Sequence, residues 1–298
     1  MKHIDKTYKE LVTKLFEEGK YKPNRTEIET PFVLHGEMFK HDLNDGFPAI
    51  TTKKLAFKSC LAELLWFIEG SNDERRLAEI QYGKPRSELE DKRTIWTDNY
   101  EADYWQYGKK ESYIKDSKRD GKNFLGAVYG VQWKEFLIGD DIFNQLDFVI
   151  DQLKNKPYSR KIMMLSYSPE QIDDAVLTAC HTMVQFLVLD GKLNCLWTQA
   201  SADVFLGLPF DIASYAILTH MLAQVCNLEV GEITCFLGDA HIYENAVEPI
   251  KQQIKNHSYE MPILWLNPLI KNIYDFTMDD VKLIGYKHHE QMKVSMAV

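Results

Sequence analysis

Cys180 is followed directly by His181, and a thiol beside an imidazole is a combination that enzymes use for nucleophilic catalysis. The dipeptide is weak evidence by itself, because adjacent residues on a strand point to opposite faces and cannot pair directly. Arg25, Arg160 and Lys161 would favour the Cys180 thiolate if the fold brings them close. Cys180 is therefore a candidate nucleophile whose activation depends on residues that lie far away in the sequence.

Polar side chains also gather between residues 199 and 215, in a segment that is otherwise rich in Val, Phe, Leu and Ile. These polar residues are Gln199, Ser201, Asp203, Asp211, Ser214 and Tyr215. Because buried polar groups must find partners, this density predicts either an internal hydrogen-bond network or a bound ligand. The residues alone leave both interpretations open.

Two further places could contact a ligand. His241 and Tyr243 are two residues apart in GDAHIYENA and share a face if that segment is extended, which suits two donors to one hydroxylated ligand. Arg25 lies in the turn-like loop KPNRTEIET and could hold an anion, although an exposed loop arginine usually has no specific role.

Periodic patterns predict the helices that would position these groups. Helical spacing is found in residues 7–17, followed by Gly19 as a C-cap, in residues 59–70, and in residues 142–154. The longest apolar segment, residues 209–231, predicts a buried helix that is introduced by a proline and ends before a glycine.

Apolar and alternating runs predict strands in residues 31–43, 161–168, 183–199 and 232–238. Asp190-Gly191 divides the third of these runs and is a strong signal for a type I′ hairpin. We therefore expect an α+β fold, with a largely antiparallel or mixed sheet packed against one long central helix.

Composition is that of an ordinary globular protein. The 298 residues are 45% hydrophobic and 27% charged, which excludes disordered and collagen-like chains. The net charge of -9 has the wrong sign for a protein that coats nucleic acid. We expect a single domain over residues 1–298, with a solvated, charged insertion of helix and loop around residues 71–122.

The five cysteines are odd in number and lack CxxC spacing, which makes a disulfide framework or a zinc site improbable. The first residues lack the apolar core of a signal peptide, and no run approaches the ~18 apolar residues that a membrane span needs. We expect a cytoplasmic protein with reduced thiols, no metal and no membrane partner.

The run from Thr178 to Tyr243 resembles the catalytic half of the thymidylate synthases. NRTEIET, DGFPAITTKK, ELLWFIEG, IWTDN, GAVYGVQW, YSRKI and the C-terminal MAV resemble the other landmarks of that family, in the same order. The similarity covers essentially the whole chain apart from the charged insertion.

The resemblance implies transfer of a one-carbon unit from 5,10-methylenetetrahydrofolate to C5 of a pyrimidine nucleoside monophosphate, without metal or obligatory nucleic acid. Cys180 would add to C6 of the base and make C5 nucleophilic. Glu63 would relay protons through water. The remaining residues of the implied catalytic set are Tyr129, Asp203 and His181.

The resemblance also implies a binding set and a homodimer that forms through the sheet. The nucleotide would be held by Arg25, Arg160, Lys161, Gln199, Ser201, Asp211, His241 and Tyr243, of which Arg160 and Lys161 would reach the partner's phosphate. The folate would be held by Lys53, Trp96, Leu177, Gly207, Phe210 and Val298.

One departure from the family pattern concerns the base. The family sequence LPFNIASY is LPFDIASY here, with Asp211 in place of the asparagine. The asparagine offers one donor and one acceptor, which match uracil, whereas a carboxylate only accepts. Cytosine supplies an N4 amino donor, and a second donor when N3 is protonated. Uracil O4 against Asp211 would leave buried acceptors unpaired, at about 1 to 3 kcal/mol each.

Other departures concern the phosphate and the folate. Ala200 stands where the family has an arginine, Lys161 replaces a second arginine, and Asn99 stands where a second tryptophan is usual. The phosphate site is therefore expected to be rearranged, or the sugar to differ, so that CMP is a candidate beside dCMP.

Cytidylate hydroxymethylation is the favoured prediction, because Asp211 also marks the deoxycytidylate hydroxymethylases. The alternatives are a thymidylate synthase that tolerates Asp211, and a dCMP or CMP methylase, which Trp96, Leu177, His181 and the C-terminal MAV favour. A non-enzymatic relative that binds nucleotide or RNA is a further alternative, against which the retained Cys180 and Glu63 argue.

Overall fold

A mixed β-sheet forms the centre of the molecule. The structure is a computed structural model that describes residues 3–24, 26–107 and 111–297. The strand order is β1-β2-β9-β7-β6-β5, and β8 pairs with β9 beside this path. The strands are β1 (Lys20–Lys22), β2 (Thr30–Asp42), β5 (Met163–Leu165), β6 (His181–Leu189), β7 (Lys192–Gln199), β8 (Ala202–Asp203) and β9 (Glu229–Ile242).

The sheet combines both strand directions. Its pairs β1·β2, β2·β9, β5·β6 and β6·β7 are antiparallel, whereas β7 and β8 both pair with β9 in parallel. The hairpin between β6 and β7 turns at Asp190 and Gly191, whose φ angles of 50° and 76° are those that a type I′ turn requires. The predicted mixed sheet and its hairpin are both confirmed.

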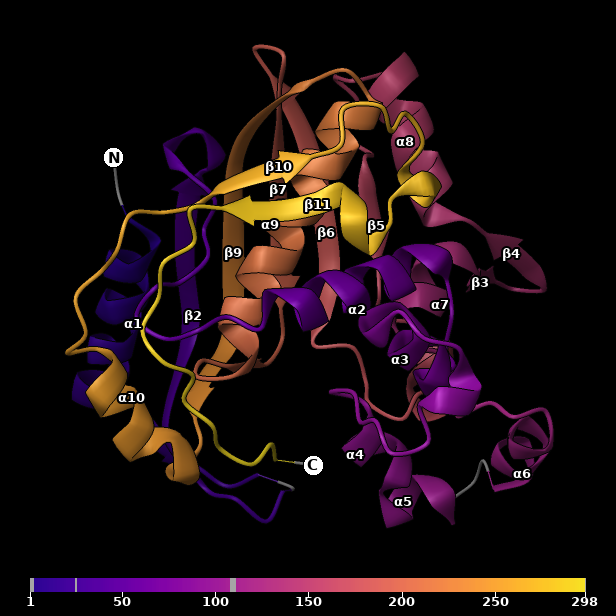
Figure 1. Ribbon diagram of the computed structural model, residues 1–298, viewed down its shortest axis with the longest axis horizontal. Coiled ribbons are helices and arrows are strands. Elements are labelled where there is room, and N and C mark those ends of the chain that lie inside the picture. Colours follow the sequence, from indigo (N-terminus) through magenta and orange to yellow (C-terminus); the bar gives the residue numbers. More distant parts are fainter. Residues whose placement is uncertain (1–2, 25, 108–110, 298) are drawn as a thin grey trace.

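Helix α9 (Gly207–Val225) is the long buried helix that the sequence predicted. Its own apolar residues lie on every side of the helix and most of them are buried, as in a helix that is covered by protein throughout. It packs against the sheet, and α2 (Phe57–Glu69) crosses it (Figure 1). The other helices of the main body are α1 (Ile4–Glu18), α7 (Tyr129–Lys134), α8 (Gln145–Asn155) and α10 (Val247–Gln253).

Residues 71–122 form a group of short helices beside α2. These are α3 (Glu74–Tyr82), α4 (Thr97–Glu101), α5 (Asp103–Gln106) and α6 (Glu111–Arg119). The expectation that this segment is merely solvated is wrong in part, because Glu74, Trp96 and Trp105 are buried. The buried Glu74 carboxylate is neutralised by Arg75, whose Nη2 lies 2.6 Å from Oε1. A charge-rich segment can therefore still contribute buried side chains to the protein interior.

Smaller elements complete the fold. Two peripheral hairpins are formed by β3 (Phe136–Ile138) with β4 (Asp141–Phe143), and by β10 (Ile263–Leu266) with β11 (Val281–Ile284). Short 3-10 helices lie at Leu43–Asp45, Arg86–Glu88, Pro169–Asp174, Glu244–Ala246, Ile273–Asp275 and Met278–Asp280. None of the helices in the described ranges combines the length and the apolar character that crossing a membrane requires. None of the five cysteines, all of which lie in the described ranges, forms a disulfide bond.

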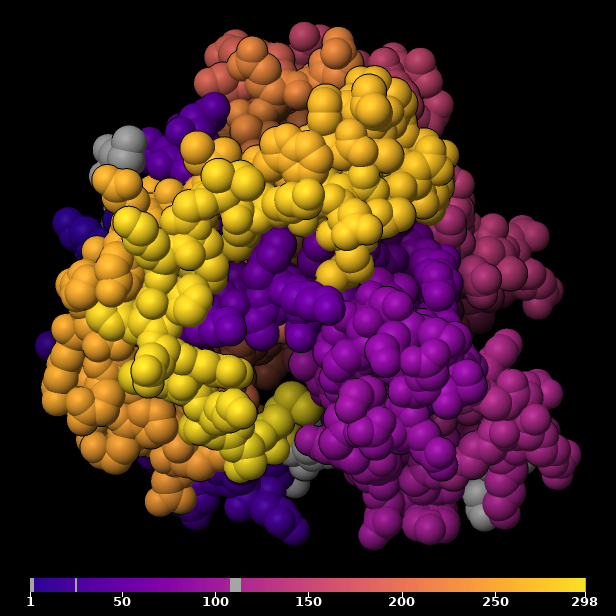
Figure 2. Space-filling model, in the orientation of Figure 1, coloured from indigo at the N-terminus to yellow at the C-terminus, as the bar shows by residue number. Residues whose placement is uncertain are grey.

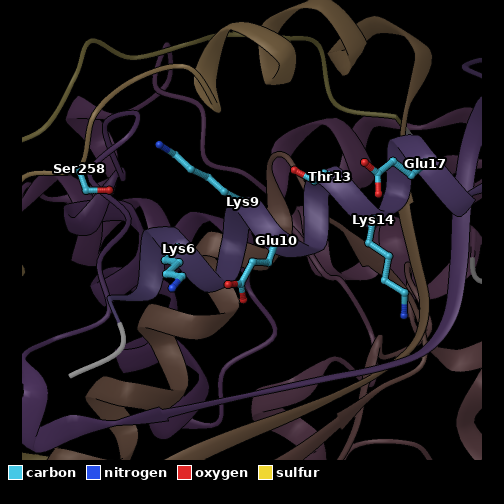
Figure 3. Close-up of a pocket in the computed structure, with 7 residues that line it drawn as sticks. All are labelled: Lys6, Lys9, Glu10, Thr13, Lys14, Glu17 and Ser258. Carbon is cyan, nitrogen blue, oxygen red and sulfur yellow. The ribbon is translucent and has the colours of Figure 1, made fainter.

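The outer face of α1 carries an open pocket (Figure 3). Its lining residues carry charges of both signs, and they are Lys6, Lys9, Glu10, Thr13, Lys14, Glu17 and Ser258. The Lys14 ammonium is paired with Glu37 of β2 at 2.7 Å. Because the candidate residues of the sequence analysis are not among these side chains, the pocket is a separate surface feature.

Candidate active site

The backbone of the candidate nucleophile is tied to a buried tyrosine. The N–H of Cys180, just before β6, donates to the hydroxyl of Tyr129 at 2.8 Å. The Tyr129 and His181 rings lie 5.1 Å apart. Burial raises the pKa of Tyr129 well above its usual value, so the hydroxyl stays protonated and keeps a proton to donate. Tyr129 therefore joins Cys180 and His181 in one partly buried cluster, although it is 51 residues away from Cys180.

Glu63 enters the same cluster from α2. Its Oε1 accepts a hydrogen bond from Trp96 Nε1 at 2.7 Å. Burial raises the pKa of Glu63 to about 7, with the charge of Asp211 adding to the rise and the Trp96 hydrogen bond opposing it. A carboxyl group with this pKa is ready both to accept and to donate a proton near neutral pH.

Asp211, in the first turns of α9, is held at both carboxylate oxygens. His181 Nε2 lies 3.0 Å from Oδ1, and Gln199 Nε2 donates to Oδ2 at 2.7 Å. Trp197 Nε1 donates to Gln199 Oε1 at 3.2 Å, which fixes which end of the amide faces Asp211. The polar density between residues 199 and 215 thus forms an internal network, one of the two outcomes that the sequence left open.

Asp203 ends β8 and precedes α9. Its Oδ1 accepts hydrogen bonds from the backbone N–H groups of Phe205 and Leu206, at 2.9 and 3.1 Å. Burial raises the pKa of Asp203, against the effect of these donors and of His241. Gly207 lies between the two aspartates, because a Cβ built on it would be 3.8 Å from both Asp203 Cβ and Asp211 Oδ2.

Lys53 points into the protein. It is 5% exposed, its ammonium donates to the carbonyl of Phe205, and Nζ lies 3.6 Å from the centre of the Phe205 ring. Burial lowers the pKa of Lys53 to about 8, while the charge of Asp203 opposes the shift. In this structure the ammonium therefore faces the interior beside Asp203. Its expected contact with an anionic folate tail stays a prediction.

His241 and Tyr243 lie together, with ring centres 4.8 Å apart. His241 Nδ1 is 2.8 Å from Asp239 Oδ1, and the other oxygen of Asp239 is 2.6 Å from Lys22 Nζ. The sequence analysis missed Asp239. Its signal was available, because Asp239 is two residues before His241 and shares its face of an extended segment.

The comparisons with known proteins decide the family. The sequence profile of the family described as thymidylate synthase matches residues 6–298. The chain belongs to the thymidylate synthase family. It is 38% identical, over 318 aligned positions that cover 99% of both chains, to a thymidylate synthase of Staphylococcus haemolyticus. The chain is accordingly a one-carbon transferase that uses methylenetetrahydrofolate as its co-substrate.

At the predicted phosphate site, Ala200 departs from the thymidylate synthase pattern. Ala200 is exposed, and its N–H donates to the carbonyl of Cys180 at 2.7 Å. Ser201 is half-buried, whereas Arg160 and Lys161 are exposed just before β5. Arg25 lies outside the described residues. The structure therefore places Ser201 beside Gln199, whose Nε2 donates to the Ser201 carbonyl at 3.1 Å, but leaves Arg160 and Lys161 on the surface of this chain.

The remaining folate candidates come from four separate segments. Trp96 is buried beside Glu63, while Leu177 and Phe210 are half-buried and pack against the hydrophobic core. The C-terminal segment is anchored by Asn245, whose Nδ2 donates to the Ser295 carbonyl at 2.9 Å. Val298 lies outside the described residues. In the space-filling view, this segment borders a hollow whose opposite side is formed by the helices around α2 to α4 (Figure 2).

No three His, Cys, Asp or Glu side chains in the described part of the chain are grouped so that they could hold a metal ion. The polar groups of the cluster are instead engaged with one another. This arrangement suits proton transfer and covalent addition by side chains.

Proposed function

We propose that this protein transfers a one-carbon unit from methylenetetrahydrofolate to C5 of a cytidylate, dCMP or CMP, and that the product is the hydroxymethyl derivative. The observation that carries the proposal is the carboxylate of Asp211 in the catalytic cluster. His181 and Gln199 use one lone pair on each of its oxygens. A carboxylate oxygen has two, so each can still accept a hydrogen bond from a base.

The remaining acceptors match cytosine better than uracil. Cytosine offers its N4 amino group, and it offers N3–H once N3 is protonated in the C6 adduct. Uracil would place its O4 against a carboxylate oxygen, which leaves two acceptors facing each other at a cost of about 1 to 3 kcal/mol. This difference corresponds to a preference of roughly fivefold to 150-fold.

In the proposed reaction the Cys180 thiolate forms a bond to C6, and the electron pair of the C5=C6 double bond shifts so that C5 becomes nucleophilic. C5 attacks the methylene carbon of methylenetetrahydrofolate, and one C–N bond of that carbon breaks. Loss of the C5 proton and cleavage of the remaining C–N bond then release tetrahydrofolate and leave an exocyclic methylene on C5. Glu63, with a pKa of about 7, moves protons through water at these steps. Addition of water to the exocyclic methylene gives the hydroxymethyl group, and loss of Cys180 restores the ring.

The supporting roles follow the positions of the other side chains. Tyr129 holds the Cys180 backbone and would assist loss of the thiolate. His241 and Tyr243 would bind the sugar, and Asp203 would hold the pterin. The remaining proposed folate contacts are Lys53, Trp96, Leu177, Gly207, Phe210 and Val298, and the proposed phosphate contacts are Arg25, Ser201, Arg160 and Lys161.

A second candidate function is methylation of dUMP. The observation that favours it is the 38% identity to a thymidylate synthase over nearly the whole chain. The two functions differ in the base and in the final step, because methylation consumes hydride from tetrahydrofolate and releases dihydrofolate.

One assay separates these functions. The protein is incubated with methylenetetrahydrofolate and C5-tritiated dCMP, CMP or dUMP, and released tritium, dihydrofolate and product mass are measured. The proposal expects release from a cytidylate, a hydroxymethyl product and no dihydrofolate. Release from dUMP alone would overturn the cytidylate assignment, and dihydrofolate with a methylated cytidylate would overturn the hydroxymethyl product.

We also propose that two copies pair through the face of the sheet that α9 leaves uncovered. Met38, Leu165, Leu187 and Phe236 are between 38% and 53% exposed there, and Met38 lies opposite Phe236 in the register of β2 and β9. Such a row of exposed apolar side chains is typical of an interface.

The homodimer has a test of its own. If Arg160 reaches the partner's site, Arg160→Ala and Cys180→Ser are each inactive alone but regain activity when mixed, because one site of the heterodimer is complete. A monomeric mass in light scattering, or mixtures that stay inactive although subunits exchange, would overturn this proposal.

A further inference from the structure

His181 and Asp211 form a close pair of opposite charges beside the candidate nucleophile. His181 begins β6, Asp211 lies in α9, and their side chains are 12% and 16% exposed. His181 Nε2 and Asp211 Oδ1 are 3.0 Å apart. An asparagine at residue 211 would take away the carboxylate that His181 contacts, so the ion pair depends on the aspartate of this chain.

Two kinds of donor hold the Asp211 carboxylate. The imidazole of His181 contacts Oδ1, and the amide of Gln199 contacts Oδ2 at 2.7 Å. Hydrogen bonds to both oxygens favour the ionised form of a carboxyl group, and a cationic donor favours it more strongly than a neutral one.

A second acidic group faces this pair. Glu63 of α2 interacts electrostatically with both Asp211 and His181. The other titratable groups around the pair are Tyr129 of α7, Tyr215 of α9, Cys180, Cys60 of α2 and Cys235 of β9. Two neighbouring carboxyl groups in a buried site do not both ionise without a compensating charge. A protonated His181 supplies that charge to Asp211.

The surroundings favour the protonated form of His181. Burial lowers the pKa of His181, but the charge of Asp211 and its hydrogen bond outweigh this effect, and Glu63 adds to them, so the pKa lies above its usual value. The cationic form of His181 is therefore favoured more strongly than that of an ordinary histidine.

The charge state of Asp211 has a direct consequence for the base. A protonated carboxyl group carries one O–H donor and one carbonyl acceptor, which is the donor and acceptor pattern of a carboxamide and fits uracil. The ionised group only accepts and fits cytosine. Protonation of Asp211 would thus change the preferred base from cytosine to uracil.

We propose that His181 is a specificity-determining residue, which acts through Asp211 by holding the carboxylate ionised so that the site selects cytosine over uracil. This inference rests on the proposed function. His181 is a positioning residue in this scheme, because its contact is with Asp211.

The test compares His181→Gln with Asp211→Asn. A glutamine can still donate to Asp211 but carries no charge. For each protein, kcat/KM of tritium release is measured with the preferred cytidylate and with dUMP, from about pH 6 to about pH 8.5, on either side of the usual histidine pKa. Folding is checked by circular dichroism.

For the wild type, the ratio of kcat/KM with the cytidylate to kcat/KM with dUMP is expected to stay constant over this pH range. The same ratio for His181→Gln falls roughly tenfold at the acid end, the effect of one mispaired group, and recovers towards the wild-type ratio at higher pH. Asp211→Asn favours dUMP at every pH. His241→Gln is the matched control, because this histidine also pairs with an aspartate, Asp239 at 2.8 Å, and its loss lowers both activities equally.

The outcomes separate the two proposals. A wild-type enzyme that prefers dUMP overturns the proposed function, and this inference falls with it. A wild-type enzyme that prefers a cytidylate, together with a His181→Gln ratio that is unchanged or is lowered equally at every pH, overturns only this inference.

A second measurement needs no activity. Nitrogen-15 NMR of the histidine side chains is expected to show a doubly protonated His181 ring at neutral pH in the wild type and a neutral ring in Asp211→Asn. A neutral His181 in the wild type would overturn the inference even if the His181→Gln protein fails to fold.

Discussion

Trp96 Nε1 donates a hydrogen bond of 2.7 Å to Glu63 Oε1, and this bond joins two separate parts of the chain. Glu63 lies on α2, whereas Trp96 belongs to the charged segment of residues 71–122. A donor of this kind stabilises the ionised carboxylate and opposes the effect of burial on its pKa. The charged segment therefore helps to set the proton affinity of the carboxyl group that we propose for proton relay.

Removal of this donor should shift the pH dependence of the reaction. In Trp96→Phe the carboxylate loses its hydrogen bond, so the pKa of Glu63 rises above about 7. The limb of the pH profile that reports Glu63 moves to higher pH, whichever protonation state is active. The profile of tritium release measures this. Trp105→Phe is the control, because Trp105 is equally buried but donates to the carbonyl of Phe124. An identical shift in both variants would contradict the prediction.

Glu63→Gln should lower the activity and raise the stability of the protein at alkaline pH. Burial raises the pKa of Glu63 from 4.5 to about 7, so its favourable contribution is present below about pH 4.5 and is lost as the pH rises to 7. The glutamine variant is thus more stable than wild type at about pH 8, by on the order of 2 kcal/mol, and not at about pH 4. Activity falls by roughly 10² to 10⁴.

Urea unfolding at the two pH values measures the stability change. Glu69→Gln is the control, because Glu69 lies on the same helix and its side chain is 43% exposed. Equal stability changes in the two variants would show that the buried charge of Glu63 is not their cause.

Cys180→Ser should abolish the reaction. The proposed bond to C6 requires a thiolate, and loss of an enzyme nucleophile lowers kcat by roughly 10³ to 10⁶. Tritium release measures the loss, and mass spectrometry of the denatured complex measures the covalent adduct. Cys226→Ser, a change at a half-buried thiol on the far end of α9, keeps both signals. Substantial tritium release from Cys180→Ser would refute the covalent route.

His220 should make the fold sensitive to mild acid. Its Nε2 is buried without a hydrogen-bond partner among the described residues, and burial lowers the pKa of His220 to about 4. The unfolded chain, with a histidine pKa of 6.5, binds the proton first, so stability is lost as the pH falls from 6.5 towards 4. His220→Leu retains about 2 kcal/mol more of its stability than wild type when the pH is lowered from about 7.5 to about 5.

Urea unfolding at both pH values checks this difference. His35→Gln, a change at an exposed histidine of β2, serves as the control and should lose stability as wild type does. A His220→Leu variant with the same acid loss as wild type would contradict the prediction.

Local sequence patterns predicted the elements well because each pattern reports a local cause. Alternation predicted the strands, Asp190-Gly191 predicted the turn between β6 and β7, and the unbroken apolar run predicted α9. Family resemblance then selected residues that the fold brings together, such as Cys180 and Tyr129. The prediction of a single domain stays a prediction.

Side-chain partners were beyond the reach of local patterns. The burial of Glu74 depends on threonines and an asparagine that come later in the chain, and the inward direction of Lys53 depends on a carbonyl in the turn before α9. Composition marks such residues as surface charges, because charged side chains are rarely buried unless they are paired. Only the tertiary structure shows that the pairing exists.

The carboxylate of Glu74 also couples the site to the way the chain folds. It accepts hydrogen bonds from Thr94 and Thr97, on either side of Trp96, and from Asn123, which closes a loop of 49 residues. The entropy lost on closing the loop is offset only when these contacts form together. The loop between Glu74 and Asn123 should therefore open and close as one cooperative unit. Each opening would separate Trp96 from Glu63. A bound ligand that keeps this loop closed should therefore slow amide hydrogen exchange throughout the loop.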